Sequence, residues 1–378
     1  MMDRLFIVSS DELGTLDQNP TMSNSTAYVT DPDAVLIWRT IPPVLLCCGT
    51  VGSVLSLVVL TQKSMKRSPM TSYLTTLAVI DIMVLYTGLL RHWLKYFFDI
   101  EIRSLNIFFC KVHPWLVYLT LDMSAWLLVC MTLERVVSVW KPHRVKTICT
   151  STASHISIVV VVVFLLGINS HFVYGKELID VVKDNVTSKK CTQTDEHYRH
   201  FLYDIFPWID LCIYCLIPFS IQIVGNCLII GKIVLNARRM SAVMKNQNEK
   251  ENRKRQVSSM TVMLLTLNAV FLLCTSPVSV YIIYIGYWKL QNINYQSRST
   301  DLMWVLSICL MYFNNSFNFL FYCLSGKRFR SELKHVFRGL PTSSSKPDTF
   351  TLSHAESTPQ IGRTPTDKNT NETYITRF

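Results

Sequence analysis

Ionisable side chains lie within stretches of the chain that are otherwise apolar, and they are the first candidates for chemistry. Asp81 lies inside one such stretch, and Glu134 and Arg135 close another. A carboxylate at the centre of a bilayer costs about 2.5–3.5 kcal/mol on insertion scales, so Asp81 needs partners. An arginine near the end of a stretch can reach water or pair with the neighbouring acid. Asp81 therefore predicts polar partners within the membrane, whereas Arg135 on its own could simply anchor its helix at the inner face.

Catalysis is not indicated by the remaining polar residues. His143, His171 and His197 share no spacing that is typical of metal ligands, and we interpret them as loop or interfacial residues. The sequence predicts a protein that is not an enzyme and that has no metal-ligand cluster.

Seven apolar stretches must position the charged residues. A bilayer core needs about 20 apolar residues per helix, and 49% of the residues are hydrophobic while 17% are charged. Buried helices of a soluble protein are the alternative, but such helices show a polar face. The run 156–167 has no polar face beyond Ser157. We predict an all-α membrane protein with spans at 40–62, 70–94, 107–139, 153–174, 203–235, 257–287 and 300–323.

The distribution of charge predicts how the chain is oriented. The net charge of +11 could indicate a nucleic-acid partner, but the basic residues collect in alternate linkers, such as 63–67, 141–146 and 238–255. Basic residues mark cytoplasmic loops and also contact anionic lipid. We expect a multi-pass plasma-membrane protein with an extracellular N-terminus and no nucleic-acid partner.

Three parts follow from this topology. Residues 1–39 form an extracellular tail, 40–338 form the membrane domain, and 339–378 form a disordered cytoplasmic tail rich in Ser, Thr and Pro. We find no cleavable signal peptide. Residues 327–337 place apolar side chains on one face, which predicts an amphipathic surface helix after the seventh span. Asn24 and Asn185 match the glycosylation acceptor pattern on the outer side.

Cysteines are numerous, but most of the twelve lie within the spans, where they act as small apolar residues. Cys110 and Cys191 lie on the oxidising side of the membrane. We expect a disulfide between them that ties the long loop to the third span.

Motifs in a fixed order link the chain to a known family. They are Leu77-Ala78-Val79-Ile80-Asp81, Glu134-Arg135-Val136, Pro218, the run from Phe271 to Pro277, and Asn318-Phe319-Leu320-Phe321-Tyr322. In these motifs the chain resembles the rhodopsin-like (class A) G-protein-coupled receptors over residues 40–338. The resemblance implies a seven-transmembrane helix bundle and a heterotrimeric G protein as partner.

The chain departs from the family pattern at several switch positions. Thr275 and Phe319 replace the expected tryptophan and proline, and Val257 replaces an acid that often pairs with the arginine. We therefore expect raised basal activity.

The resemblance assigns roles to two groups of residues in the membrane. Asp81, Ser124, Asn314 and Asn318 match positions that form an oxygen-rich pocket suited to a sodium ion and waters. A plain hydrogen-bond network around a protonated Asp81 is the alternative. The activation switch and G-protein contact would comprise Glu134, Arg135, Asn226, Phe271, Pro277 and Tyr322. Phosphorylation of the C-terminal tail would recruit arrestin after a receptor kinase has acted.

The sequence constrains the chemical class of the ligand mainly by excluding two known classes. Val117 stands where aminergic receptors carry an aspartate, and Tyr312 stands where opsins carry a lysine. The outer half offers charged and aromatic residues that suit a peptide, although belt aromatics are the alternative for some of them. The candidate ligand residues are Arg91, His113, Val117, Tyr118, Asp210, Tyr281, Tyr284 and Trp304.

The overall pattern most resembles invertebrate neuropeptide receptors of the FMRFamide type. We keep two alternatives open: a class A receptor for a small non-peptide cue, and a transporter or channel. The lack of an internal repeat counts against the last of these.

Overall fold

The structure is a computed structural model of the chain. It describes residues 31–65, 68–183, 186–243, 247–290 and 298–338. All of them belong to one compact unit, Met1–Pro341. The predicted glycosylation sites Asn24 and Asn185 and the tail 339–378 lie outside the described residues.

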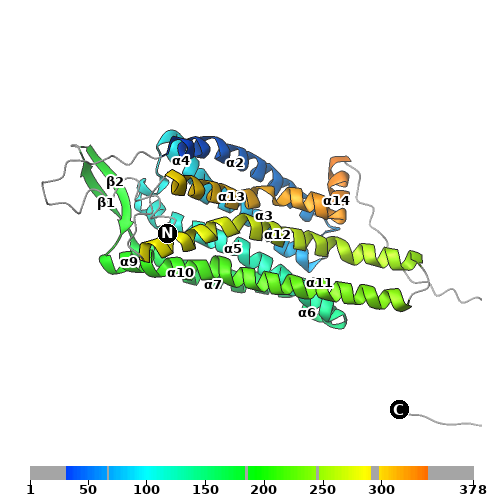
Figure 1. Cartoon of the computed structure of the whole chain (residues 1–378). Helices are drawn as coiled ribbons and strands as arrows, with labels where there is room; N and C mark the ends of the chain where they lie inside the picture. The colour runs from blue at the N-terminus through cyan, green and yellow to red at the C-terminus, as the bar shows by residue number, and fades with distance from the viewer. Residues whose placement is uncertain (1–30, 66–67, 184–185, 244–246, 291–297, 339–378) are drawn as a thin grey trace, which may run out of the picture. The chain divides into compact units, whose positions relative to one another are not determined.

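Long helices packed side by side form the body of the molecule (Figure 1). In chain order the bundle consists of α2 (Pro32–Leu60), α3 (Pro69–Val84) with η2 (Leu85–Leu89) and α4 (Leu90–Phe98), α5 (Ile107–Trp140), α7 (Ser151–Asn169) with α8 (His171–Gly175), α9 (Glu196–His200) with η5 (Phe201–Ile205), α10 (Phe206–Asp210), η6 (Leu211–Leu216) and α11 (Ile217–Val243), α12 (Gln247–Leu290) and α13 (Arg298–Ser325). Short linker helices are η3 (Ile102–Ser104), η4 (Pro142–Arg144) and α6 (Val145–Ile148).

Polar side chains begin several of these helices. The Asp31 carboxylate accepts a hydrogen bond from the backbone N–H of Asp33, and Pro32 follows at the first helical position. Asn106 caps α5 and Thr150 caps α7 in the same manner. Each cap satisfies a backbone donor that the helix itself leaves without a partner.

The described residues include six helical segments that are long and apolar enough to cross a membrane. Within the apolar stretch of Ile107–Trp140, 72% of the residues are buried, against 22% within that of Ser151–Gly175. Helix α5 is therefore the central helix, and α7 lies at the periphery. Helix α13 is the seventh helix of the bundle and packs against α2 and α12.

The two ends of the bundle differ (Figure 1). At one end, β1 (Lys176–Lys183) and β2 (Val186–Gln193) form an antiparallel hairpin. At the other, α14 (Lys327–Arg338) crosses the direction of the bundle helices. We call these the hairpin end and the α14 end.

Proline and a widened helical turn interrupt the fifth span. The π-helical segment η6 (Leu211–Leu216) lies directly before Pro218. Proline has no backbone N–H and cannot donate to the carbonyl one turn earlier, so the turn before it is free to widen. Pro277 also removes a backbone donor, within α12, but there the helix continues without a widened turn. Both prolines lie where the motifs predict a bend.

The predicted fold is confirmed, with changes at the boundaries. Helix α2 begins at Pro32, earlier than the expected start of the first span at residue 40, because Asp31 caps it there. The surface helix α14 buries Phe329, which is 2% exposed, whereas Phe337 is 70% exposed. Its apolar face therefore continues through Leu333 and Val336.

Candidate functional site

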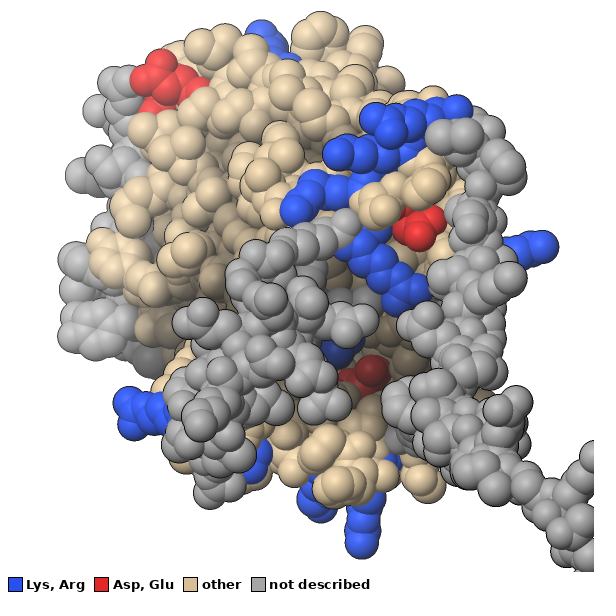
Figure 2. All heavy atoms as spheres, turned by 90° about the vertical axis from the view of Figure 1, so that its right-hand side faces the viewer, with Lys and Arg blue, Asp and Glu red and all other residues tan. Residues whose placement is uncertain are grey.

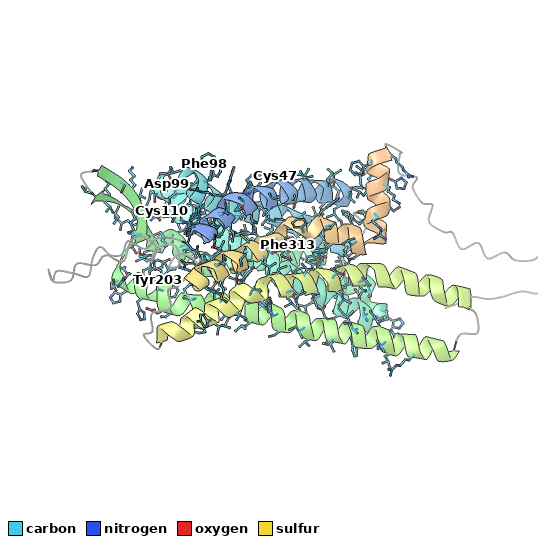
Figure 3. The ribbon with its side chains drawn as sticks, turned by 45° about the horizontal axis from the view of Figure 1, so that its top comes forward. Cys47, Phe98, Asp99, Cys110, Tyr203 and Phe313 are labelled. Carbon is cyan, nitrogen blue, oxygen red and sulfur yellow. A yellow bond between two sulfur atoms is a disulfide. The ribbon has the colours of Figure 1, made fainter. Side chains whose placement is uncertain are left out.

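A disulfide joins the hairpin to the central helix. Cys110 lies in the first turn of α5, and Cys191 lies in β2 opposite Leu178 of β1. Their Cα atoms are 5.5 Å apart. Figure 3 labels Cys110 and Asp99, the residue after α4, at the hairpin end. The predicted disulfide is confirmed, and it holds the hairpin over this end of the bundle.

Charged side chains are buried beneath the hairpin. The Arg91 guanidinium donates to both carboxylate oxygens of Glu101, at 2.8 Å each, and the Lys95 ammonium lies 3.9 Å from the same carboxylate. Burial alone would raise the pKa of Glu101, but Arg91 and Lys95 bring that pKa below its ordinary value. Glu101 therefore carries its charge at neutral pH.

Two further cations complete what we call the basic cluster, which consists of Arg91, Arg103 and Lys176. Arg103 is 8% exposed, and its Nε lies 3.2 Å from Nδ1 of His113. Lys176 is 3% exposed, and burial, with the nearby charges of Arg103 and Arg91, lowers its pKa to about 7. Burial likewise lowers the pKa of Arg103 to about 10. Cations gathered in this way suit an anionic ligand group.

Four of the predicted ligand residues belong to this cluster or lie next to it: Arg91, His113, Val117 and Tyr118. Arg91, Val117 and Arg103 line the same small cavity. Tyr118 is 4% exposed, stacks on Phe172 at 4.6 Å between ring centroids, and interacts electrostatically with Arg103.

The aromatic candidates of the sixth and seventh spans lie on facing helices. Tyr281 of α12 and Trp304 of α13 are both buried, with ring centroids 5.3 Å apart. Tyr284 is 40% exposed, so the structure does not bury it with the other candidates.

Several polar residues at this end were not predicted. Asp122 of α5 is 2% exposed and accepts a hydrogen bond from the Asn169 amide at 2.9 Å. It is an ionisable residue within a span, so the reasoning applied to Asp81 would have found it. Arg103 and Lys176 lie in linkers, where no periodicity indicates burial.

Asp81 lies between the two ends, on α3. Its Oδ2 accepts a hydrogen bond from the Asn318 amide at 2.7 Å, and the side chain is 1% exposed. Its Oδ1 has no hydrogen-bond partner among the described residues. A buried carboxylate oxygen of this kind fits a small cation, since hard cations prefer oxygen ligands. The Ser124 hydroxyl donates to the side-chain oxygen of Asn315 at 3.2 Å. Its partner in the structure is therefore the residue that follows Asn314, which the sequence had predicted.

At the α14 end, Arg135 reaches across to α3. Its Nε and Nη2 atoms lie 2.8 and 2.6 Å from the Met70 sulfur. Glu134 interacts electrostatically with Arg135, as expected for neighbours of opposite charge. A guanidinium held in part by a thioether, which is a weak acceptor, can leave it at little cost.

Asn268 connects three helices near this end. Its amide donates to Thr132 Oγ1 of α5 and to Asn226 Oδ1 of α11, at 2.9 Å each. Asn268 and Thr132 are both fully buried. We call this arrangement the Asn268 contact. Neither Asn268 nor Thr132 was predicted, because a single polar side chain within an apolar helix gives no periodic signal.

The other predicted switch residues are buried nearby. Phe271 packs against Phe219 at 5.7 Å between centroids, and Tyr322 packs against Phe329 at 5.6 Å. Figure 2 looks onto the α14 end, where basic side chains clearly outnumber acidic ones. On α14, Arg328, Lys334 and Arg338 are exposed.

A bundle of membrane-length helices with a disulfide-tied hairpin at one end and a short crosswise helix at the other is the fold of a seven-transmembrane receptor. The chain matches the 7 transmembrane receptor (rhodopsin family) over residues 52–322 and belongs to that family. It is thus a G-protein-coupled, non-enzymatic receptor.

Individual relatives are distant. The chain is 23% identical over 323 residues to the FMRFamide receptor of Drosophila melanogaster, covering 82% of this chain but 54% of that receptor. It is 24% identical to the cysteinyl leukotriene receptor 1 of Cavia porcellus, covering 86% and 92% of the two chains. It is also 24% identical to the galanin receptor 2b of Danio rerio, covering 85% and 80%. The chain therefore spans about half of the fly receptor's length.

Proposed function

We propose that this receptor binds an extracellular neuropeptide at the hairpin end and activates a heterotrimeric G protein at the α14 end. The main support for this proposal is that charged side chains and aromatic rings are buried together beneath the disulfide-tied hairpin. Arg91, Arg103 and Lys176 offer positive charge there, and Tyr118 and Trp304 offer aromatic surface. Peptides carry complementary groups of both kinds.

The named relatives support a peptide without identifying it. Two of the three are named for peptides, the FMRFamide and galanin receptors. A small non-peptide acid is the second candidate, because the basic cluster suits an anion and another relative is named for a leukotriene.

Signal transfer would run through the centre of the bundle. A sodium ion held by Asp81 and its neighbours Ser124, Asn314 and Asn318 would favour the resting packing, and ligand binding would shift the equilibrium away from it. Rotation of α12 at Pro277 would then part Asn268 from Thr132. Arg135 would leave Met70 and meet the G protein, together with Asn226 and Tyr322.

The expectation of raised basal activity rests on Val257, which offers no acid to Arg135. The Asn268 contact supplies a different restraint between α5, α11 and α12. We propose that this contact, rather than an ion pair, sets the basal activity.

Orientation and partners complete the proposal. The basic α14 end would face the cytoplasm of a plasma membrane, in agreement with the distribution of positive charge. Anionic lipid would contact α14. A receptor kinase and arrestin would act on the Ser- and Thr-rich tail.

A screen of short amidated peptides, including Phe-Met-Arg-Phe-amide, tests the peptide assignment. The receptor is expressed with a panel of G proteins, and nucleotide exchange is measured. Activation by one or more peptides is expected. Activation by acidic lipids, with silence toward every peptide, would replace the first candidate by the second.

A further inference from the structure

Two acidic residues lie next to each other in the half of the bundle nearer the hairpin. Asp122 of α5 is 2% exposed, and the Asn169 amide donates to its Oδ2 at 2.9 Å. Its Oδ1 is buried and has no hydrogen-bond partner in the described part of the chain. An unsatisfied buried carboxylate oxygen is costly, so it needs an explanation.

Asp210 supplies the second carboxylate, from the last residue of α10. One turn beyond Asp122, the Trp126 indole donates to the backbone oxygen of Ile213 at 3.1 Å. This bond aligns α5 with the fifth span, and both run away from the hairpin end. Asp122 therefore lies level with Asp210, and the two carboxylates interact electrostatically. We call them the acid pair.

The acid pair has no basic side chain as a partner in the part of the chain that the structure describes. Among the described residues, neither carboxylate forms an ion pair with Lys, Arg or His. Two carboxylates close together in an apolar setting disfavour full ionisation of both unless a cation joins them. Ionisable groups inside a membrane bundle are costly and mark functional sites by default.

The acid pair lies one helical turn further from the hairpin end than Tyr118. Asp210 is only partly buried. Tyr118, one turn nearer the hairpin on α5, interacts electrostatically with both Arg103 and Asp210, so it lies between the basic cluster and the acid pair. A ligand that meets the basic cluster therefore has a second pole of opposite charge below it.

We propose that Asp122 and Asp210 together bind a cationic group of the ligand, a guanidinium or a primary ammonium. Asp210 meets the entering cation, and the free Oδ1 of Asp122 contacts it from α5. Asn169 holds the Asp122 carboxylate in place. This inference rests on the proposed function, because it names the chemistry of the ligand at that site.

The test uses a probe that does not depend on knowing the agonist. The purified full-length receptor is melted with Nα-acetyl-L-arginine amide (below, arginine amide) or with Nα-acetyl-L-citrulline amide (citrulline amide). Acetylation removes the α-ammonium from both probes, so they have nearly the same shape and differ in the charge of the guanidinium alone. At about ten times its Kd, arginine amide should raise the melting temperature by about 2–4 °C. Citrulline amide should bind much more weakly. Equal shifts from the two probes would overturn the proposal without any variant.

Isosteric variants locate the probe. In Asp122→Asn and in Asp210→Asn the apparent Kd for arginine amide should rise at least about 30-fold, as expected when one partner of a buried charge pair is removed. The matched control is Asp180→Asn, an exposed aspartate of β1, which should bind the probe like the wild type. Unchanged affinity in both acid-pair variants would contradict the site. Should one variant fail to fold, the other and the comparison of probes on the wild type still decide.

Failure of this inference differs from failure of the proposed function. If the receptor responds to peptides but binds the two probes equally, the peptide assignment stands and the cation site is contradicted. If the receptor binds the arginine probe more tightly than the citrulline probe but responds to no peptide, the cation site stands and the peptide assignment is contradicted.

Discussion

The hairpin end and the α14 end are held together by different kinds of contact. At the hairpin end, the Cys110–Cys191 disulfide and the bidentate Arg91–Glu101 ion pair fix the hairpin and its neighbours. At the α14 end, α5, α11 and α12 are joined by two hydrogen bonds of Asn268. A disulfide stabilises by about 2–4 kcal/mol, whereas a neutral hydrogen bond contributes about 0.5–1.5 kcal/mol.

This difference shows which end can rearrange at low cost. The free energy needed to break the Asn268 contact is similar to an allosteric coupling energy, which is about 1–3 kcal/mol. A ligand that binds the active state slightly more tightly than the resting state can therefore break it. The contacts at the hairpin end exceed that range. The hairpin end is therefore suited to hold a ligand in a fixed frame, and the α14 end is suited to switch.

Removal of the disulfide should have the largest effect on the contrast. Cys110→Ser or Cys191→Ser should destabilise the receptor by about 2–5 kcal/mol, because the hairpin loses its covalent tie. Surface expression and melting temperature measure the loss. Cys212→Ser, at an exposed free cysteine, is the control and should behave like the wild type. Normal expression and stability of both disulfide variants would show that the hairpin end does not depend on this tie.

The ion pair beneath the hairpin should have the next largest effect. Glu101→Gln removes the charge that faces Arg91 and should lower the free energy of unfolding by about 1–3 kcal/mol, since the pair is partly buried. Glu196→Gln is the control, because its ion pair with Arg199 is exposed and such pairs contribute little. Equal melting temperatures for the two variants would show that the Arg91–Glu101 ion pair does not stabilise the hairpin end.

Asp81 should link the two ends through a bound ion. Raising the sodium concentration should raise the melting temperature of the wild type by a few degrees, and Asp81→Asn should abolish the increase. An ion that binds only the resting packing stabilises it by mass action. The same experiment with potassium is the control for ionic strength. A sodium effect that persists in Asp81→Asn would place the ion elsewhere.

A further predicted effect concerns the pH dependence of stability at the hairpin end. The pKa of Lys176 is about 7 in the folded protein, below its ordinary value of 10.5. Above pH 7 the unfolded chain therefore binds more protons than the folded one, and stability should rise with pH. The gain is at most about 1.4 kcal/mol per pH unit. Lys176→Met should flatten the rise in melting temperature between pH 7 and 9, and an unchanged slope would mean that another group titrates.

The fold was largely predictable because membrane helices follow simple rules. The lengths of the spans follow from the thickness of the bilayer. The Cys110–Cys191 disulfide was predictable because the span pattern places both cysteines on the same side of the membrane. Asp81 was identified because an ionisable group in an apolar stretch needs a partner, and the structure gives it Asn318. Helix starts were less predictable, since the Asp31 cap of α2 depends on one local hydrogen bond.

Residues whose roles depend on tertiary contacts were not predicted. Asn268 lies in an apolar stretch, and its value comes only from Thr132 and Asn226, which are distant in sequence. Arg103 and Lys176 are ordinary linker cations in the sequence. Packing of the hairpin over the bundle buries both of them.

We propose that the Asn268 contact restrains a switch that works through Arg135, and basal nucleotide exchange tests this restraint without any ligand. Asn268→Ala should raise basal exchange on a heterotrimeric G protein about fivefold, because hydrogen bonds worth about 1 kcal/mol are lost from the resting state. The control Ser276→Ala, which removes only a hydrogen bond within α12, should leave exchange unchanged. Adding Arg135→Ala to Asn268→Ala should abolish the increase while the receptor still reaches the surface. Basal exchange in Asn268→Ala no higher than in the wild type, or full exchange in the double variant, would contradict the account.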